Sequence, residues 1–203
     1  MKKLLALTLA GALFFALSAC GVSSAPAPTS SSSTQSVSSE AASPIEPQDL
    51  VMGTGSTGGT YFALGGAMAN AINNKLADRQ ITITAQSTGA SVENMNLINA
   101  GEMDLGIVMN NVAANGFAGI GAFTAPVTNV SSIGVVYNEV YQIVANASTG
   151  AKNVEDLRGL KIAVGPAGSG TVGLSEKIFA AAGMDINKVI LPQSDSFSDA
   201  ATK

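Results

Sequence analysis

The glycine-rich segment "GTGSTGGTYFALGG", Gly53–Gly66, indicates how the chain folds. It follows a short apolar run, "DLVMG", which has the pattern of a buried strand, and a helix is predicted from Thr60 onward. A glycine-rich turn between a strand and a helix leaves the first N–H groups of the helix free to face an anion. The apolar stripe that predicts the helix consists of Tyr61, Leu64, Met68, Ile72 and Leu76.

Strand and helix patterns alternate along the chain after this turn. A strand is predicted over Ile81–Ser87, and the next helix is predicted to have Ser91 as its N-cap and Gly101 after its end. A third strand is predicted over Met103–Asn110, and Ser131–Asn146 is predicted to form one long strand or two consecutive ones. The alternation favours an α/β fold with helix-covered parallel sheets.

The opening arrangement occurs a second time about 110 residues later. Asn153 is predicted to cap a short helix that ends at Gly159, and a strand follows over Lys161–Gly165. The segment "GPAGSGTVGLSEKIFAAAG" then repeats the order of strand, glycine turn, hydroxyl residues and helix. Two such turns, one in each half of the molecule, predict a clamp for a small organic anion.

A dinucleotide is the less favoured ligand for the first turn, although Gly53, Gly55 and Gly58 have the spacing of a dinucleotide-binding motif. The second predicted strand ends without an acidic residue for a ribose hydroxyl, and the turn lacks the Gly-Lys-Ser/Thr ending of a phosphate loop. A purely structural glycine turn stays open as an alternative.

Residues 1–20 have the features of a secretion signal. Lys2 and Lys3 precede an apolar run that is too short to cross a bilayer. The following "LSAC" resembles a bacterial lipobox, which implies lipidation of Cys20 and attachment to a membrane; an ordinary signal peptide is the alternative. Residues 21–48 are rich in Ser, Ala and Pro and are predicted to form a solvated tether.

The composition excludes several classes of function. The formal net charge of −4 disfavours a role in nucleic-acid binding. The chain has no histidine, and Ser175 and Lys177 cannot pair because positions i and i+2 of a helix do not face each other. We therefore expect a binding protein rather than an enzyme, without a cofactor or a metal.

From Asp49 onward, the chain resembles the TAXI family of extracytoplasmic solute receptors, which serve TRAP transporters. The resemblance rests on the order of several segments, among them "TGASVENMNLINAGEMDLGIVMNN", "VVYNEVYQIVA" and "NVEDLRGLKIAVGPAGSGT". It implies a fold like that of type II periplasmic binding proteins, with a first lobe over 49–140 and a second lobe over 141–203. It also implies capture of glutamate or another small acid and its delivery to an integral-membrane permease.

The same resemblance implies a set of ligand-binding residues from both lobes and from the segment that joins them. Each has an alternative structural role, because serine and threonine cap helices, asparagine fills turns and tyrosine packs in cores. The implied residues are Thr54, Ser56, Thr60, Tyr61, Asn110, Asn111, Tyr137, Ser169, Gly170 and Thr171.

Two departures from the family pattern leave questions open. Asn111 stands where the family has aspartate, so the choice between an amino acid and a plain dicarboxylate is undecided. The chain is also shorter than the family's receptors, so we expect an incomplete second lobe. Glu93 and Glu139 are predicted to lie on the surface, with a position that reaches a cleft as the alternative. The only two arginines, Arg79 and Arg158, are predicted to be solvated or to balance carbonyl dipoles.

Two further functions are open alternatives. A receptor of an ATP-driven importer would have the same fold, and a surface lipoprotein without a transport role would have the same N-terminal features.

Overall fold

The computed structural model describes residues 46–203. The predicted signal over 1–20, the predicted lipidation site at Cys20 and the tether as far as residue 45 lie outside the described residues. Within the part of the chain that the structure describes, no helix is both long enough and apolar enough to cross a membrane.

The first lobe contains a parallel sheet of three strands in the order β2-β1-β3. These strands are β1 (Gln48–Gly53), β2 (Ile81–Gln86) and β3 (Leu105–Gly106). In the register of β1 and β2, Leu50 lies opposite Ile83. Both side chains belong to the core on one face of the sheet, which explains the alternating apolar pattern of the two strands.

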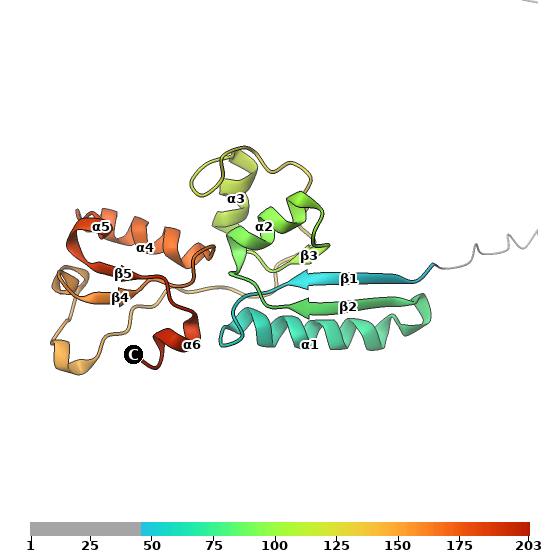
Figure 1. Cartoon of the computed structure of the whole chain (residues 1–203), viewed down its shortest axis with the longest axis horizontal. Coiled ribbons are helices and arrows are strands. Elements are labelled where there is room, and N and C mark those ends of the chain that lie inside the picture. The colour runs from blue at the N-terminus through green and yellow to red at the C-terminus, as the bar shows by residue number, and fades with distance from the viewer. Residues whose placement is uncertain (1–45) are drawn as a thin grey trace, which may run out of the picture. The chain divides into compact units, whose positions relative to one another are not determined.

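Three longer helices complete this lobe: α1 (Thr60–Lys75), α2 (Ser91–Ala100) and α3 (Asn110–Ala118). Figure 1 shows α1 running along β1 and β2. A short 3-10 helix, η1 (Ala77–Arg79), connects α1 to β2. One core lies between α1 and the sheet, and a second lies around α2 and α3; their buried members are Met52, Tyr61, Ala69, Ile83, Ala90 and Ile107 in the first and Met95, Val112, Phe123 and Val127 in the second.

Close approach of α1 to the end of β1 explains one glycine of the opening stretch. A Cβ added at Gly65 would overlap Cγ2 of Thr54, whereas a Cβ at the neighbouring Gly66 would meet nothing within 4 Å. Gly65 therefore lets the helix lie directly against the strand end from which the glycine turn begins.

The second lobe contains the parallel pair β4 (Lys161–Ala163) and β5 (Leu191–Gln193). Its main helix is α4 (Gly170–Ala181). The core around these elements is formed by Leu157, Val164, Phe179, Met184, Ile186 and Ile190. The shorter elements are η2 (Ala147–Thr149), η3 (Val154–Leu157), α5 (Ile186–Val189) and α6 (Phe197–Ala200).

The structure confirms the predicted α/β architecture with helix-covered parallel sheets. The order of strand, glycine turn and helix occurs twice, as β1 to α1 and as β4 to α4. The two halves have separate cores, although the residue at which one lobe gives way to the other stays a prediction. The predicted cap of the short helix before β4 is also confirmed, because Asn153 and Asp156 form a capping box.

The predicted third strand, Met103–Asn110, is wrong in its extent. Only Leu105 and Gly106 pair with β1. At the preceding position, the carboxylate of Asp104 accepts a hydrogen bond from Val51 N–H (2.8 Å), so a side chain takes the place of a backbone partner. At the other end, Asn110 already begins α3.

The strand or strands predicted over Ser131–Asn146 are absent from the described structure, which assigns these residues no regular element. A strand needs a hydrogen-bonded neighbour, and none of the strands within residues 46–203 pairs with this segment. Its apolar side chains are accordingly exposed, with Ile133, Val135 and Val144 each close to nine-tenths exposed. The apolar pattern reflects the strand propensity of this segment, but it does not show whether a neighbouring strand is present to pair with it.

The predicted N-cap at Ser91 is also wrong. Ser91 is the first residue of α2, and Ala90 occupies the cap position with a φ of 80°. The Ser91 hydroxyl instead accepts a hydrogen bond from Met109 N–H (3.0 Å). It thereby joins the start of α2 to the segment that leads into α3.

Candidate functional site

A buried asparagine holds the end of β1 in position. Asn94 is fully buried, and its amide donates to the carbonyls of Thr54 (2.8 Å) and Ile107 (2.9 Å). Its side-chain oxygen accepts a hydrogen bond from the Thr88 hydroxyl (2.7 Å). One side chain thus joins the ends of β1 and β3 and the loop after β2, so the first glycine turn begins from a fixed point.

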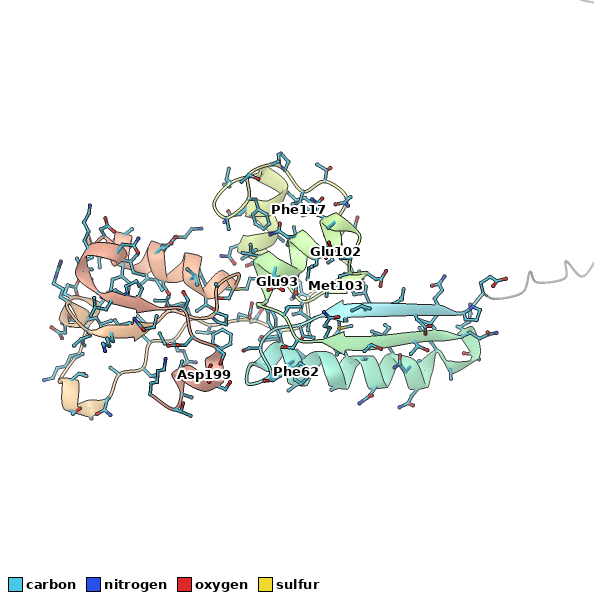
Figure 2. All side chains as sticks on the ribbon, viewed as in Figure 1. Phe62, Glu93, Glu102, Met103, Phe117 and Asp199 are labelled. Atoms are coloured by element: carbon cyan, nitrogen blue, oxygen red, sulfur yellow. The ribbon has the colours of Figure 1, made fainter. Side chains whose placement is uncertain are left out.

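The two lobes meet at the start of α2. Val92 N–H donates to the carbonyl of Gly168 (2.8 Å), and Glu93 N–H makes a longer contact with the same oxygen (3.4 Å). Gly168 belongs to the second glycine turn and has a φ of +85°, which favours glycine. Glu93 projects from this end of α2 (Figure 2), and its carboxylate accepts from Gly89 N–H (2.7 Å). A protein carbonyl therefore already occupies the start of α2.

The starts of α1 and α4 differ from the start of α2. Their N-cap residues are Gly59 and Ser169, and no side chain among residues 46–203 caps either helix. By contrast, Asn153, Asp185 and Ser196 cap the shorter elements of the second lobe with their side chains. The two uncapped starts line one cavity of about 250 Å³. Their first N–H groups are thus available to a ligand.

Two serine hydroxyls in this cavity are buried and unpartnered. Oγ of Ser56, from the first glycine turn, and Oγ of Ser169, from the second, have no hydrogen-bond partner within the described residues. Ser169 as a whole is only 5% exposed. A buried hydroxyl without a partner is unfavourable, and native proteins rarely retain one unless a ligand or water satisfies it.

The cavity brings together seven of the ten predicted site residues. Its lining also includes residues that the sequence did not single out as ligand-binding, among them a carboxylate and an aromatic ring from the far end of the chain. The seven are Ser56, Thr60, Tyr61, Tyr137, Ser169, Gly170 and Thr171, and the additional members are Gly55, Gly58, Gly59, Ala90, Ser91, Met109, Glu139 and Phe197.

Three predicted residues do not line the cavity. Thr54 is fully buried and donates its hydroxyl to the carbonyl of Gln86 (2.6 Å), so it connects β1 to β2. Asn110 accepts a hydrogen bond from Asn111 N–H (2.7 Å) at the start of α3. The side-chain oxygen of Asn111 is buried without a partner among the described residues, but outside the cavity lining. Thr54 therefore has a structural role, although it links two strands rather than capping a helix, and both asparagines lie in the first turn of α3.

Comparison with known sequences identifies the family. The NMT1-like family matches residues 52–203, which include both glycine turns and every residue that lines the cavity. This chain belongs to the NMT1-like family.

Solved structures of two sulfonate-binding proteins are similar to this NMT1-like protein. The alkanesulfonate-binding protein SsuA from Xanthomonas axonopodis pv. citri, bound to MOPS, has 16% identity and a TM-score of 0.45, and the alignment covers 77% of this chain and 50% of that one. The periplasmic aliphatic sulphonate binding protein SsuA from Escherichia coli has 18% identity and a TM-score of 0.40, with 77% and 47% covered. The chain spans about half the length of these proteins.

A carboxylate between two tyrosines occupies one part of the cavity of the NMT1-like protein. Glu139 accepts a hydrogen bond from the Tyr61 hydroxyl on one oxygen (2.9 Å) and from the Tyr137 hydroxyl on the other (3.1 Å). The two rings lie edge to face, with centroids 6.4 Å apart. Glu139 therefore faces the cavity, although it was predicted to be a surface residue; its side chain is exposed as well.

Both tyrosines remain protonated near neutral pH. Burial raises the pKa of Tyr61 far above its usual value of 10.0, and the Glu139 carboxylate raises it further, while the Ser91 hydroxyl partly offsets the effect. Burial and then the charge of Glu139 raise the pKa of Tyr137 to about 12. Both hydroxyls therefore act as donors to the carboxylate.

The charged groups of the cavity lining determine the electrostatic potential of the site. Of the cavity-lining residues within 46–203, Glu139 alone is charged, and no lysine or arginine is among them. Arg79 and Arg158 are exposed, as predicted. Positive potential in the cavity therefore comes from the two helix starts, and negative charge comes from one carboxylate.

The residues that sequence reasoning missed differ in how readily they could have been found. Glu139 lies two positions after Tyr137 in an extended segment, and alternate side chains of such a segment point to the same side. That spacing could have placed Glu139 beside the predicted tyrosine. Phe197 belongs to α6, and no local pattern links it to a site formed by turns that lie so far before it in the chain.

Proposed function

We propose that this protein is an extracytoplasmic solute receptor that binds a small organic anion in the cavity between its two lobes. The observation that carries the proposal is a pair of unpartnered serine hydroxyls in one cavity: Ser56 lies in the turn before α1, and Ser169 is the N-cap of α4. Its role is binding rather than catalysis.

A carboxylate suits this arrangement on three grounds. Free N–H groups at a helix start favour negative charge, and two such starts act together here. The hydroxyls of Ser56 and Ser169 supply donors that lack an acceptor in the described structure. Thr60 and Thr171, each in the first turn of its helix, add two more hydroxyls to the lining.

The size of the cavity favours a small ligand. Its volume of about 250 Å³ is below the range of roughly 300 to 1,000 Å³ that is common for drug-sized ligands. Ala90, Met109 and Phe197 give it apolar walls that fit a short aliphatic chain.

The proposed transport role extends this binding role. The resemblance to the TAXI family supports delivery of the bound acid to a TRAP permease, and the lipobox-like "LSAC" supports a lipid anchor at Cys20 that would hold the receptor near this partner. Membership of the NMT1-like family is compatible with this role.

The binding role can be tested by titration calorimetry of the full chain with a panel of amino acids, monocarboxylates and dicarboxylates. We expect at least one carboxylate to bind. Ser169→Ala should weaken that binding by about 1.5 to 3 kcal/mol, because the hydroxyl would donate to a charged oxygen.

Ser131→Ala removes an exposed hydroxyl outside the cavity and serves as the matched control. Equal affinities of the wild type and the Ser169→Ala variant would remove this hydroxyl from the site. A panel in which no acid binds at millimolar concentration would contradict the proposed function itself.

A further inference from the structure

The cavity contains a negative charge that the binding of a simple anion does not explain. Glu139 has both carboxylate oxygens turned toward tyrosine hydroxyls that line the cavity, at 2.9 Å and 3.1 Å. A carboxylate can accept about four hydrogen bonds, so each oxygen retains a free lone pair. Glu139 is thus held in place and can still accept a further donor.

No protein cation balances this charge. Lysine and arginine are missing from the cavity lining within the described range, and the only two ion pairs identified there, Asp185–Lys188 and Asp195–Lys203, lie elsewhere in the second lobe. An anionic ligand with no other charge would place a second uncompensated negative charge near Glu139, and like charges repel each other.

The groups around Glu139 have the chemistry of an ammonium site. Tyr61 and Tyr137 flank the carboxylate with rings that lie edge to face. A carboxylate accepts the hydrogen bonds that an ammonium group must donate. The helix starts at the other part of the lining suit a carboxylate.

We infer that the ligand is zwitterionic: it is a small molecule that carries an ammonium group and a carboxylate, with Glu139 recognising the ammonium group. Glu139 is then the residue that selects such a ligand over the plain acid with the same carbon skeleton. This inference rests on the proposed function, because it assumes that an acid occupies the cavity. It also answers the question raised by Asn111, since the carboxylate for an ammonium group comes from the segment between the lobes.

The test compares two probes that differ by one amino group, L-glutamate and glutarate, in calorimetric titrations of the full chain. We expect glutamate to bind about tenfold more tightly than glutarate or better, which corresponds to one charge-assisted hydrogen bond. A second matched pair, L-norvaline and valerate, separates the effect of the amino group from that of the second carboxylate.

Glu139→Gln should abolish this preference. The variant removes the charge and keeps one side-chain oxygen as an acceptor, so glutamate should lose about tenfold in affinity while glutarate binds as well as before or better. Glu102→Gln is the matched control, because Glu102 is an exposed carboxylate of the first lobe outside the cavity lining (Figure 2). It should leave both affinities unchanged.

The outcomes separate this inference from the proposed function. If both members of each pair bind the wild type equally, or if the plain acid binds more tightly, the inference is overturned and the receptor role stands. The same holds if Glu139→Gln weakens both members to the same extent. If no member of either pair binds while another acid of the panel does, the inference is again overturned; if no acid binds at all, the proposed function fails with it.

Discussion

Replacement of Asn94 by alanine tests how the first glycine turn is held in place. Asn94 makes three side-chain hydrogen bonds, to Thr54, Ile107 and Thr88, and is fully buried. In the variant, the Thr54 carbonyl keeps a partner, because the Thr88 hydroxyl also lies 3.1 Å from it. The carbonyl of Ile107 loses the side-chain donor that satisfies it.

The magnitude follows from this difference. A buried carbonyl left without a partner costs about 1 to 3 kcal/mol, and loss of a hydrogen bond whose partner can rearrange costs about 0.5 to 1.5 kcal/mol. We therefore expect Asn94→Ala to lower the free energy of unfolding by about 2 to 4 kcal/mol, out of a total of about 5 to 15 kcal/mol for a typical domain.

Urea denaturation followed by circular dichroism measures this change. With a slope of about 2 kcal/mol per molar urea, the midpoint should fall by about 1 to 2 M. The matched control is Asn96→Ala, an exposed asparagine on the same helix. It should change the free energy of unfolding by less than about 0.5 kcal/mol. Equal midpoints for the two variants would refute the proposed role of Asn94.

Three further predictions follow from close contacts and from the tyrosines. Gly65→Ala should destabilise the protein by about 1 to 3 kcal/mol, because the new Cβ would overlap Thr54. Gly66→Ala should be neutral or stabilising by up to about 1 kcal/mol. Equal effects of the two variants in denaturation experiments would contradict this. Thr171→Val should weaken carboxylate binding by about 1 to 3 kcal/mol in calorimetry, and unchanged affinity would exclude a contact. The pKa of Tyr137 is raised to about 12. Its contribution to stability should therefore be constant below pH 10 and be lost as the pH rises toward 12. A gain of tyrosinate absorbance near pH 10 in the difference between the wild type and the Tyr137→Phe variant would contradict this.

Much of the fold was predictable because local signals and packing agree. Glycine turns, apolar stripes and caps located α1, α4 and the capping box of Asn153. The segment Ser131–Asn146 was not predictable in the same way, because strand propensity says nothing about whether a neighbouring strand is present to pair with it. Similarly, the shortening of β3 depends on the Asp104 side chain reaching Val51.

The site was predictable where it coincides with backbone features. Helix starts after glycine turns are visible in a sequence, and residues in or directly after those turns, such as Ser56 and Ser169, do line the cavity. Thr54 lies one residue beyond β1 and yet points into the protein, since only the register of the strand decides which way it faces. The spacing of Glu139 and Tyr137 indicated only that the two side chains lie on the same side of their segment, and the sequence did not show that this side faces the cavity.

In the proposed function, the starts of α1 and α4 hold one anion together. This arrangement can be tested most directly by recording backbone amide NMR shifts while the full chain is titrated with the tightest-binding acid of the calorimetric panel. The amides of Gly59–Tyr61 and of Ser169–Thr171 should move together, with one shared dissociation constant equal to the calorimetric value. Movement confined to one helix start, or two different dissociation constants, would contradict the account.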